Sequence, residues 1–209
     1  MSIFSTLHYD EAWRGPLAWP VAVWVVLPRK RFRYHPYFTD SKTLSERKRD
    51  EAYRMIDKLA TSWHLQYWVW MSSAWYIDKH GIMKAIERAA LQATQALFGT
   101  NLPLFKLQKR IHIEVRWPKI IVDGNGTFGL DRMLKLPVKS VIKWDLSNPR
   151  IGMASIVAKV TRDRWMRLAH KKHPKYGFAY HYWYGTQDHR NAIKKYGYCS
   201  IHRQSFVLK

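Results

Sequence analysis

One apolar run constrains the fold of this chain more than any other segment. The residues from Val21 to Leu27 are all apolar, and most of them are β-branched. This composition is typical of a strand that is buried on both of its faces. A strand of that kind lies inside a sheet with helices on either side, so the run predicts an α/β domain.

Apolar periodicity divides much of the remaining chain into helices and further strands. The pair Asp10-Glu11 is expected to precede a loop and the run at Val21. No internal repeat or linker is present. We therefore predict one α/β domain over 1–170, with a central sheet flanked by helices, and a basic, largely helical extension over 171–209 packed on it. Helices are predicted over about 45–59, 82–97, 151–170 and 186–196, and strands over about 65–71, 111–115, 120–122 and 139–143.

The chain carries a large excess of positive charge. Its 209 residues include 36 Lys and Arg against 15 Asp and Glu, which gives a net charge of +21. Such an excess favours a polyanionic partner, with nucleic acid first and a membrane surface second. The longest apolar-rich run, 16–28, is interrupted by Pro20 and is too short to span a bilayer. With one cysteine and no basic signal-peptide region, we expect a cytoplasmic protein that does not insert into membranes.

Four carboxylates lie near the predicted strands of this otherwise basic chain. Asp10 and Glu11 precede the first apolar run, Asp123 follows the strand at 120–122, and Asp145 follows the strand near 143. If these strands are neighbours, the four groups meet at one edge of the sheet. They cannot all stay ionised there without cations, and Mg²⁺ prefers oxygen ligands. The alternatives are a solvated acidic pair, a turn at Asp123 and a helix cap at Asp145.

Several motifs occur in order along nearly the whole chain and resemble those of ribonuclease HII. The first is Tyr9–Val21, which resembles G-x-D-E-A-G-R-G-P-L-A-G-P-V. The later ones are Thr39–Ser45 (D-S-K-x-L-S), Val122–Asn125 (V-D-G-N), Ala154–Arg164 (A-S-I-[LV]-A-K-V-x-R-D-R), Tyr176–Phe178 with Tyr184–Thr186 (Y-G-F and G-Y-G-T), and Ile201–Phe206 (H-R-x-S-F).

This resemblance implies an RNase H-like α/β fold with a mixed sheet and a helical C-terminal extension. It also implies a monomeric, metal-dependent endonuclease. Such an enzyme cleaves the RNA strand of RNA–DNA hybrids, and duplex DNA at an embedded ribonucleotide, leaving a 3′-hydroxyl and a 5′-phosphate. Carried over by motif, Asp10, Glu11, Asp123 and Asp145 hold two divalent ions, Mg²⁺ or Mn²⁺. These are the four carboxylates singled out above.

The resemblance also assigns substrate contacts. The loop Trp13-Arg14-Gly15 approaches the 2′-hydroxyl and the flanking phosphates, and Tyr184 packs on the sugar at the RNA–DNA junction. The 2′-hydroxyl is the group by which proteins distinguish RNA from DNA. Lys42 and Lys159 lie in matching motifs and are candidates for phosphate binding, the alternative being solvated lysines. Asp163 is expected to pair with neighbouring arginines and not to bind metal.

Tryptophan occupies several positions where the family motifs have glycine. These are Trp13, Trp19, Trp144 and Trp183, and the family has small residues near Trp70. Glycine in a substrate loop permits positive φ and close backbone approach, and tryptophan permits neither without strain. The chain contains 11 Trp and only 10 Gly. Five restored glycines would give the count of about 15 expected at the usual ~7%.

We therefore hypothesise that these tryptophans are misread glycine codons. Some bacterial lineages read UGA as glycine, and other genetic codes read it as tryptophan. The competing hypothesis is that the tryptophans are real and the chain is a catalytically impaired, nucleic-acid-binding relative, because aromatic side chains in a basic groove stack on bases. A basic protein associated with the ribosome is a third alternative, which no motif supports.

Overall fold

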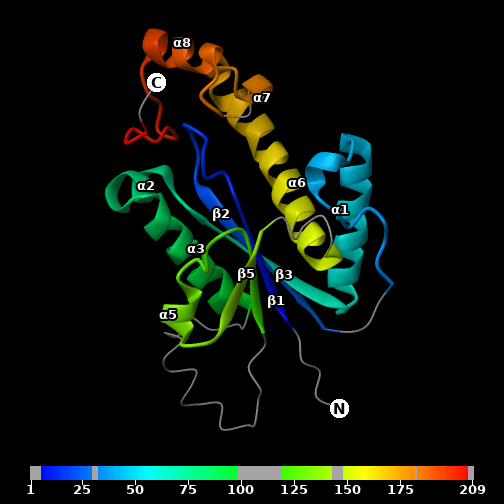
Figure 1. Cartoon of the computed structure of the whole chain (residues 1–209). Coiled ribbons are helices and arrows are strands. Elements are labelled where there is room, and N and C mark those ends of the chain that lie inside the picture. Colours follow the sequence, from blue (N-terminus) through cyan, green and yellow to red (C-terminus); the bar gives the residue numbers. More distant parts are fainter. Residues whose placement is uncertain (1–5, 30–32, 98–118, 143–147, 182, 207–209) are drawn as a thin grey trace.

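The computed structural model describes residues 6–29, 33–97, 119–142, 148–181 and 183–206, and they form an α/β structure around one sheet (Figure 1). The sheet has five strands in the order β3-β2-β1-β4-β5. Strands β3, β2 and β1 pair antiparallel, whereas β1, β4 and β5 pair parallel. The predicted central mixed sheet is therefore confirmed. The strand bounds are β1 Leu7–Ala12, β2 Val21–Pro28, β3 Leu65–Ser72, β4 Ile120–Asp123 and β5 Val138–Val141.

Helices cover both faces of the sheet (Figure 1). Helices α1 and α6 pack on one face, and α3 with α2 and α5 packs on the other. The helix bounds are α1 Glu46–Thr61, α2 Ala74–His80, α3 Ile82–Leu97, α5 Leu130–Leu134, α6 Pro149–Lys172, α7 Phe178–His181 and α8 Gln187–Tyr196. Short 3₁₀ turns, η1 Ser41–Thr43 and η3 Pro174–Tyr176, complete the described part.

Strand β2 is buried on both faces, as the apolar run predicts. Its side chains alternate between the two helical layers, which is the period of an extended strand. Val21, Val23, Val25 and Leu27 pack toward α3, and Ala22, Trp24 and Val26 pack toward α6. This strand therefore joins the two halves of the core.

Most of the predicted elements are confirmed, but strand β1 and the short helices α2, α5 and α7 were missed. Strand β1 was missed because its sequence LHYDEA mixes apolar, aromatic and charged residues. Its central place comes from pairing with β2 on one side and β4 on the other. Asp10 and Glu11 therefore lie within a strand, and not only ahead of a loop as predicted. The predicted strand at 111–115 lies outside the described residues.

The C-terminal region is helical and packs on the end of α6 and on the loop between β1 and β2. Side chains of Leu17 and Ala18 in that loop share an apolar cluster with Met166 of α6, Phe178 of α7 and Ile193 of α8. Helix α6 itself continues to Lys172. A boundary between two domains near residue 170 stays a prediction.

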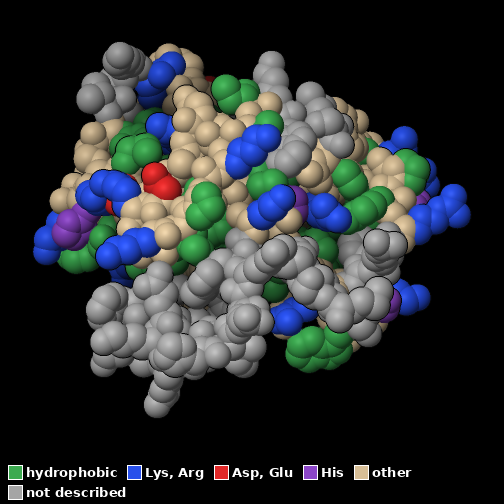
Figure 2. All heavy atoms as spheres, turned by 60° about the horizontal axis from the view of Figure 1, so that its bottom comes forward, with side chains coloured by type: hydrophobic (Ala, Val, Ile, Leu, Met, Phe, Trp, Pro, Cys, Tyr) green, Lys and Arg blue, Asp and Glu red, His purple; other side chains and the backbone are tan. Residues whose placement is uncertain are grey.

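Basic side chains are spread over the surface that Figure 2 shows, and few acidic ones lie among them. This distribution agrees with the excess of Lys and Arg in the sequence. Within the described ranges, no helix has both the length and the apolar character needed to cross a membrane.

Gly152 sets the distance between α6 and the segment that leads to η1. A Cβ at this position would lie 2.6 Å from main-chain atoms of Phe38 and Thr39. We expect Gly152→Ala to lower the free energy of unfolding by about 1–3 kcal/mol, because backbone must move to admit the methyl group. Chemical denaturation measures the change. Gly126→Ala is the control, since nothing lies within 4 Å of its Cβ; equal stability of the two variants would contradict the prediction.

Candidate active site

The predicted site residues that the structure describes all line one pocket, of about 310 Å³. The pocket joins the ends of β1 and β4 to η1, α6 and the loop before α8. Its predicted members are Asp10, Glu11, Trp13, Arg14, Gly15, Lys42, Asp123, Lys159 and Tyr184. Asp145 lies outside the described residues.

The parallel pairing of β1 and β4 brings two of the carboxylates together. Tyr9 pairs with Val122 in this ladder. One further step in the same register places Asp10 beside Asp123, the last residue of β4. Successive strand residues point to opposite faces, so Asp10 and Asp123 share a face. The pairing thus accounts for Asp10 and Asp123, and Glu11 lines the same pocket.

Glu11 lies in an environment that disfavours its charge. Burial raises its pKa to about 7, the Arg14 guanidinium opposes the shift, and the Asp123 carboxylate adds to it. A divalent cation would relieve both the burial cost and the repulsion. The carboxylate oxygens suit a hard ion such as Mg²⁺. Among the described residues, no group of three or more His, Cys, Asp or Glu side chains is arranged so that it could hold a metal ion.

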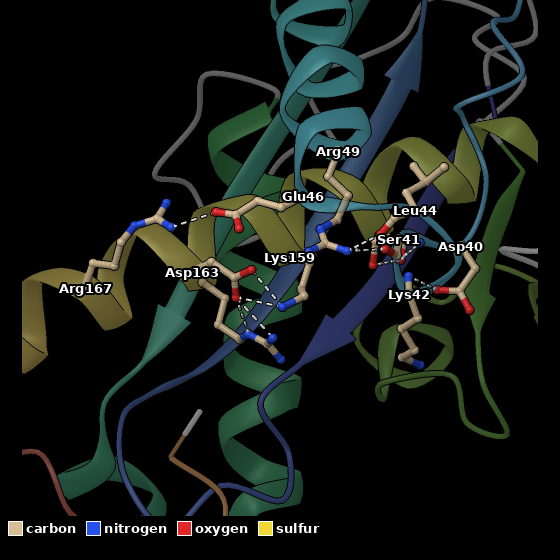
Figure 3. Close-up of polar contacts among 11 residues, drawn as sticks. Asp40, Ser41, Lys42, Leu44, Glu46, Arg49, Lys159, Asp163 and Arg167 are labelled. Carbon is tan, nitrogen blue, oxygen red and sulfur yellow. Dashed lines mark hydrogen bonds and ion pairs between the residues drawn. The ribbon is translucent and has the colours of Figure 1, made fainter. Parts of the chain in front are cut away.

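Lys42 lines the pocket from the short turn η1. Figure 3 shows the polar contacts that hold this turn. The Asp40 carboxylate accepts a hydrogen bond from the Lys42 N–H, at 2.9 Å. The Arg49 guanidinium of α1 donates to the carbonyl of Ser41, at 3.1 Å, and to that of Leu44. These contacts hold the backbone, so the exposed Lys42 ammonium extends from a fixed turn.

Helix α6 contributes a second group of charges to the pocket. Lys159 Nζ lies 2.7 Å from one Asp163 carboxylate oxygen, and Arg162 lies 3.1 Å from the other (Figure 3). The expected pairing of Asp163 with arginine is confirmed for Arg162. Burial lowers the pKa of Lys159, and its hydrogen bond to Asp163 opposes that shift. Asp163 thus keeps two cations oriented at the pocket wall.

The loop after β1 and the tyrosine before α8 are neighbours in the pocket. A Cβ on Gly15 would lie 3.6 Å from Cε1 of Tyr184. The Leu17 N–H donates to the carbonyl of Trp183, at 2.8 Å, and so ties the two segments together. The Tyr184 side chain stays accessible, because the residue is 45% exposed. These two elements therefore form one continuous surface of the pocket.

Sequence reasoning missed three polar residues that line the pocket, Ser41, Ser155 and Arg162. The Ser155 hydroxyl of α6 donates to the Ser41 hydroxyl at 3.0 Å, which joins α6 to η1. All three lie inside motifs that were recognised, beside residues that were selected. Their position in those motifs was the available signal, and nothing in their spacing distinguished them.

Four tryptophans have backbone conformations that favour glycine. Six non-glycine residues in the described part have positive φ, and the four tryptophans are Trp13 (74°), Trp19 (83°), Trp63 (58°) and Trp183 (62°). Positive φ is a genuine outlier for a bulky side chain. Three of these positions are among those where the family motifs have glycine. Trp70 lies in β3 without positive φ, and Trp144 lies outside the described residues.

At Trp63 the preference for glycine is shown by the backbone conformation alone. Trp63 follows α1, where its N–H donates to the carbonyl of Ala60 and the His64 N–H donates to that of Leu59. These two bonds form a Schellman motif, whose left-handed residue is most often glycine. No family motif covers this position.

The buried indoles add an unfavourable polar contribution. Trp13, Trp19, Trp24 and Trp183 have buried indole N–H groups with no hydrogen-bond partner among the described residues. Leaving a donor buried and unpaired costs about 1–3 kcal/mol. The rings nevertheless contact one another, with centroids 5.5 Å apart for Trp13 and Trp24 and 5.1 Å for Trp19 and Trp183. The rings of the cluster are therefore packed together, but their indole N–H groups have no hydrogen-bond acceptor among the described residues.

The order of the five strands, with helices on both faces, defines an RNase H-like α/β fold. A family model described as Ribonuclease HII matches residues 7–209. Over 202 residues the chain is 38% identical to the Ribonuclease HII of Syntrophus aciditrophicus (strain SB), covering 96% of this chain and 82% of the relative. This chain belongs to the ribonuclease HII family. It is accordingly an endonuclease of the ribonuclease H type, a hydrolase of a family in which metal binding is general.

Two solved structures show the same fold. Ribonuclease HII of Archaeoglobus fulgidus, determined in a complex with PCNA, superposes with a TM-score of 0.71 at 21% identity. The alignment covers 98% of this chain and 96% of the Archaeoglobus chain. Bst-RNase HIII in complex with Mn²⁺ has a TM-score of 0.68 at 14% identity, covering 98% of this chain and 68% of its own.

Proposed function

We propose that this chain is a metal-dependent endonuclease that acts on nucleic acid wherever RNA joins or pairs with DNA. Its substrates are the RNA strand of RNA–DNA hybrids and DNA duplexes with embedded ribonucleotides. The observation that supports this is the pocket at the carboxylates, which collects every described member of the predicted site from five separate parts of the chain. We propose further that the chain acts as a monomer.

Asp10, Glu11 and Asp123, together with Asp145, are the residues that would hold two divalent ions, Mg²⁺ or Mn²⁺. Three of the four line the pocket, and their all-oxygen donor set suits either ion. When bound, such ions activate water and stabilise the charge on the leaving oxygen. The attacking water forms a bond to phosphorus while the bond to the 3′-oxygen breaks. The products are a 3′-hydroxyl and a 5′-phosphate.

The remaining pocket residues bind and orient the substrate. Lys42, Lys159 and Arg162 line the pocket and would contact phosphates on either side of the cleaved bond. The backbone of Trp13, Arg14 and Gly15 approaches the ribose, and the Tyr184 ring packs against it. A 2′-hydroxyl offers both a donor and an acceptor to this surface, which a deoxyribose does not.

Cleavage of three matched duplexes tests the proposal. An RNA–DNA hybrid, a DNA duplex with one ribonucleotide and an all-DNA duplex of the same sequence are incubated with Mg²⁺, with Mn²⁺ or with EDTA. We expect cleavage of the first two only, only with metal, and with 5′-phosphate ends. Metal-independent cleavage, or cleavage of the all-DNA duplex, would contradict it.

A catalytically impaired binding protein is the second candidate, and the strained tryptophans are the observation that favours it. Trp13 lies in the pocket wall with positive φ, and Trp183 precedes Tyr184. If this candidate is right, none of the duplexes is cleaved with either metal, although a separate binding measurement shows that they bind.

We also propose that glycine stands at positions 13, 19 and 183 of the working protein, and at 63 as well. Positive φ at all four positions supports this. The nucleotide sequence of the gene decides the question directly. UGA codons at these positions are expected, and UGG codons would refute the hypothesis.

Lys42 provides a test of phosphate binding. Because Lys42 is exposed on a turn held by other residues, Lys42→Gln should leave the fold intact. We expect all three duplexes to bind more weakly by a similar factor. The slope of log affinity against log salt should fall by about 0.9, the value for one lost phosphate contact on a duplex. Lys84→Gln, on α3 and outside the pocket, is the control. An unchanged slope would exclude a phosphate contact.

A further inference from the structure

Arg203 is a fully buried arginine in the C-terminal segment, which the proposed mechanism does not use. Its exposed fraction is 0%, and the hydrogen bonds that its side chain makes within the described residues go to backbone carbonyls. Burial lowers its pKa to about 9, and the Asp78 carboxylate opposes that shift. The guanidinium is therefore still charged at neutral pH. A buried cation is costly unless hydrogen bonds compensate it.

The compensation comes from backbone carbonyls of the loop between β1 and β2. Nε donates to the carbonyl of Trp19 at 2.8 Å, and Nη1 donates to those of Arg14, at 3.0 Å, and Pro16, at 2.9 Å. Nη2 donates to the carbonyl of Trp13. One side chain thus satisfies four acceptors of the loop that forms the pocket wall. Only a planar fork of several donors can reach all of them.

These bonds decide which way the peptide groups of the loop face. In a trans peptide the C=O and the following N–H point in opposite directions, and the described chain contains no cis peptide. With the carbonyls of Trp13 and Arg14 turned toward Arg203, the N–H groups of Arg14 and Gly15 face away from it. Two successive N–H groups on one side form a concave donor site for an oxygen. Both residues line the pocket.

The C-terminal segment holds Arg203 in place through bonds to the same loop and to α2. The Arg203 N–H donates to the carbonyl of Leu17 at 2.8 Å, and Ala18 pairs with His202 in an isolated β-bridge. Just beyond, the Asp78 carboxylate accepts from the N–H of Gln204, at 3.0 Å, and from the N–H of Ser205, at 2.9 Å. The loop is therefore fixed from a segment at the far end of the chain.

We propose that Arg203 is a positioning residue for ribonucleotide recognition: it orients the loop 13–19 so that the N–H groups of Arg14 and Gly15 are presented to the sugar and phosphate. The identity of the substrate in this inference rests on the proposed function. The orientation of the loop rests on the hydrogen bonds of Arg203. Arg203 itself does not contact the substrate.

The test compares Arg203→Lys with the parent chain, in both the Trp13 form and the Trp13→Gly variant. The lysine keeps the charge but cannot donate to four carbonyls. Without divalent metal, the affinities for a duplex with one ribonucleotide and for the all-DNA duplex are measured, and their ratio is taken. We expect that ratio to fall about tenfold while all-DNA affinity changes little, because the non-specific phosphate contribution depends on charge. Partial unfolding lowers both affinities equally and leaves the ratio unchanged.

Asp78→Asn is the second variant, because a change at buried Arg203 can prevent folding. Asp78→Asn weakens the hydrogen bonds that hold the backbone at Gln204 and Ser205, next to Arg203. We therefore expect a smaller fall in the affinity ratio. Glu87→Gln is its control, since it removes one paired carboxylate of α3 outside the pocket. An unchanged ratio in both Arg203→Lys and Asp78→Asn, with the all-DNA affinity also unchanged, would overturn the proposal.

Hydrogen exchange of the loop amides separates this inference from the proposed function. We expect Arg203→Lys, or Asp78→Asn if the former does not fold, to speed exchange at residues 14–19 more than elsewhere. If neither parent form discriminates the duplexes or cleaves, the proposed function fails. If the parent discriminates but the variants neither lose that ratio nor loosen the loop, the inference about Arg203 fails.

Discussion

Replacing Trp13 by glycine is expected to raise the rate of cleavage at an embedded ribonucleotide by about ten- to a hundredfold, because small misplacements of a substrate-binding group cost rates of that order. The backbone at residue 13 has φ of 74°, and its residue lines the pocket beside Arg14 and Gly15. Glycine adopts this conformation freely and lets the substrate approach the backbone. Single-turnover kinetics with a saturating enzyme excess measures the change.

The control for this prediction is Trp13→Ala, which removes the indole but keeps a Cβ at positive φ. We expect it to recover only part of the rate. Stability is a poor readout, since the ring of Trp13 packs against Trp24 and Trp183 and its loss leaves a cavity. The combined replacement of Trp13, Trp19 and Trp183 by glycine should exceed the single variant. Equal turnover of the parent chain and the Trp13→Gly variant would refute the steric argument.

Replacing Asp10 by Asn is expected to reduce cleavage by at least about a thousandfold, roughly 4 kcal/mol in activation free energy. Asparagine preserves the shape of the side chain but lacks the negative charge that holds a divalent ion. The change lies at the pairing of β1 with β4, where Asp10 and Asp123 share a face. The measurement is made in whichever background cleaves faster, the parent chain or the Trp13→Gly variant.

Binding of the same duplexes provides the matched measurement for Asp10→Asn. Affinity should be retained or increased, because a negative charge near the phosphates has been removed. Asp57→Asn is the control, since Asp57 lies on α1 outside the pocket and accepts a hydrogen bond from Tyr67. Cleavage that survives in Asp10→Asn at the rate of Asp57→Asn would remove Asp10 from the proposed metal site.

Local signals in the sequence account for much of the fold. The side chains of Ser45 and Thr186 accept hydrogen bonds at the starts of α1 and α8, the helices predicted over about 45–59 and 186–196. Such caps act within one helical turn, so a short window of sequence contains all the information they need. Strand β1 has no comparable local signal, because its stability comes from two neighbouring strands.

The candidate site divides in the same way. Motifs identified the carboxylates and the loop at Trp13, since residue types and short spacings were enough for that. They did not identify Ser41, Ser155 or Arg162 as pocket residues. The geometry at Trp63 was equally hidden, because a Schellman motif is defined by backbone hydrogen bonds and φ and only weakly by residue type.

By itself, the sequence determined that β2 is a strand buried on both faces, that the net charge favours a polyanionic partner, and which carboxylates are candidates for the chemistry. The spacing of apolar residues, the net charge and the residue types can all be read directly from the linear sequence. Only the tertiary structure decided that Asp10 lies in a central strand beside Asp123, and that Arg203 holds the loop at Trp13 across 190 residues of sequence. Contacts of that separation leave no periodicity in the chain, because they exist only once the sheet and the C-terminal segment have packed.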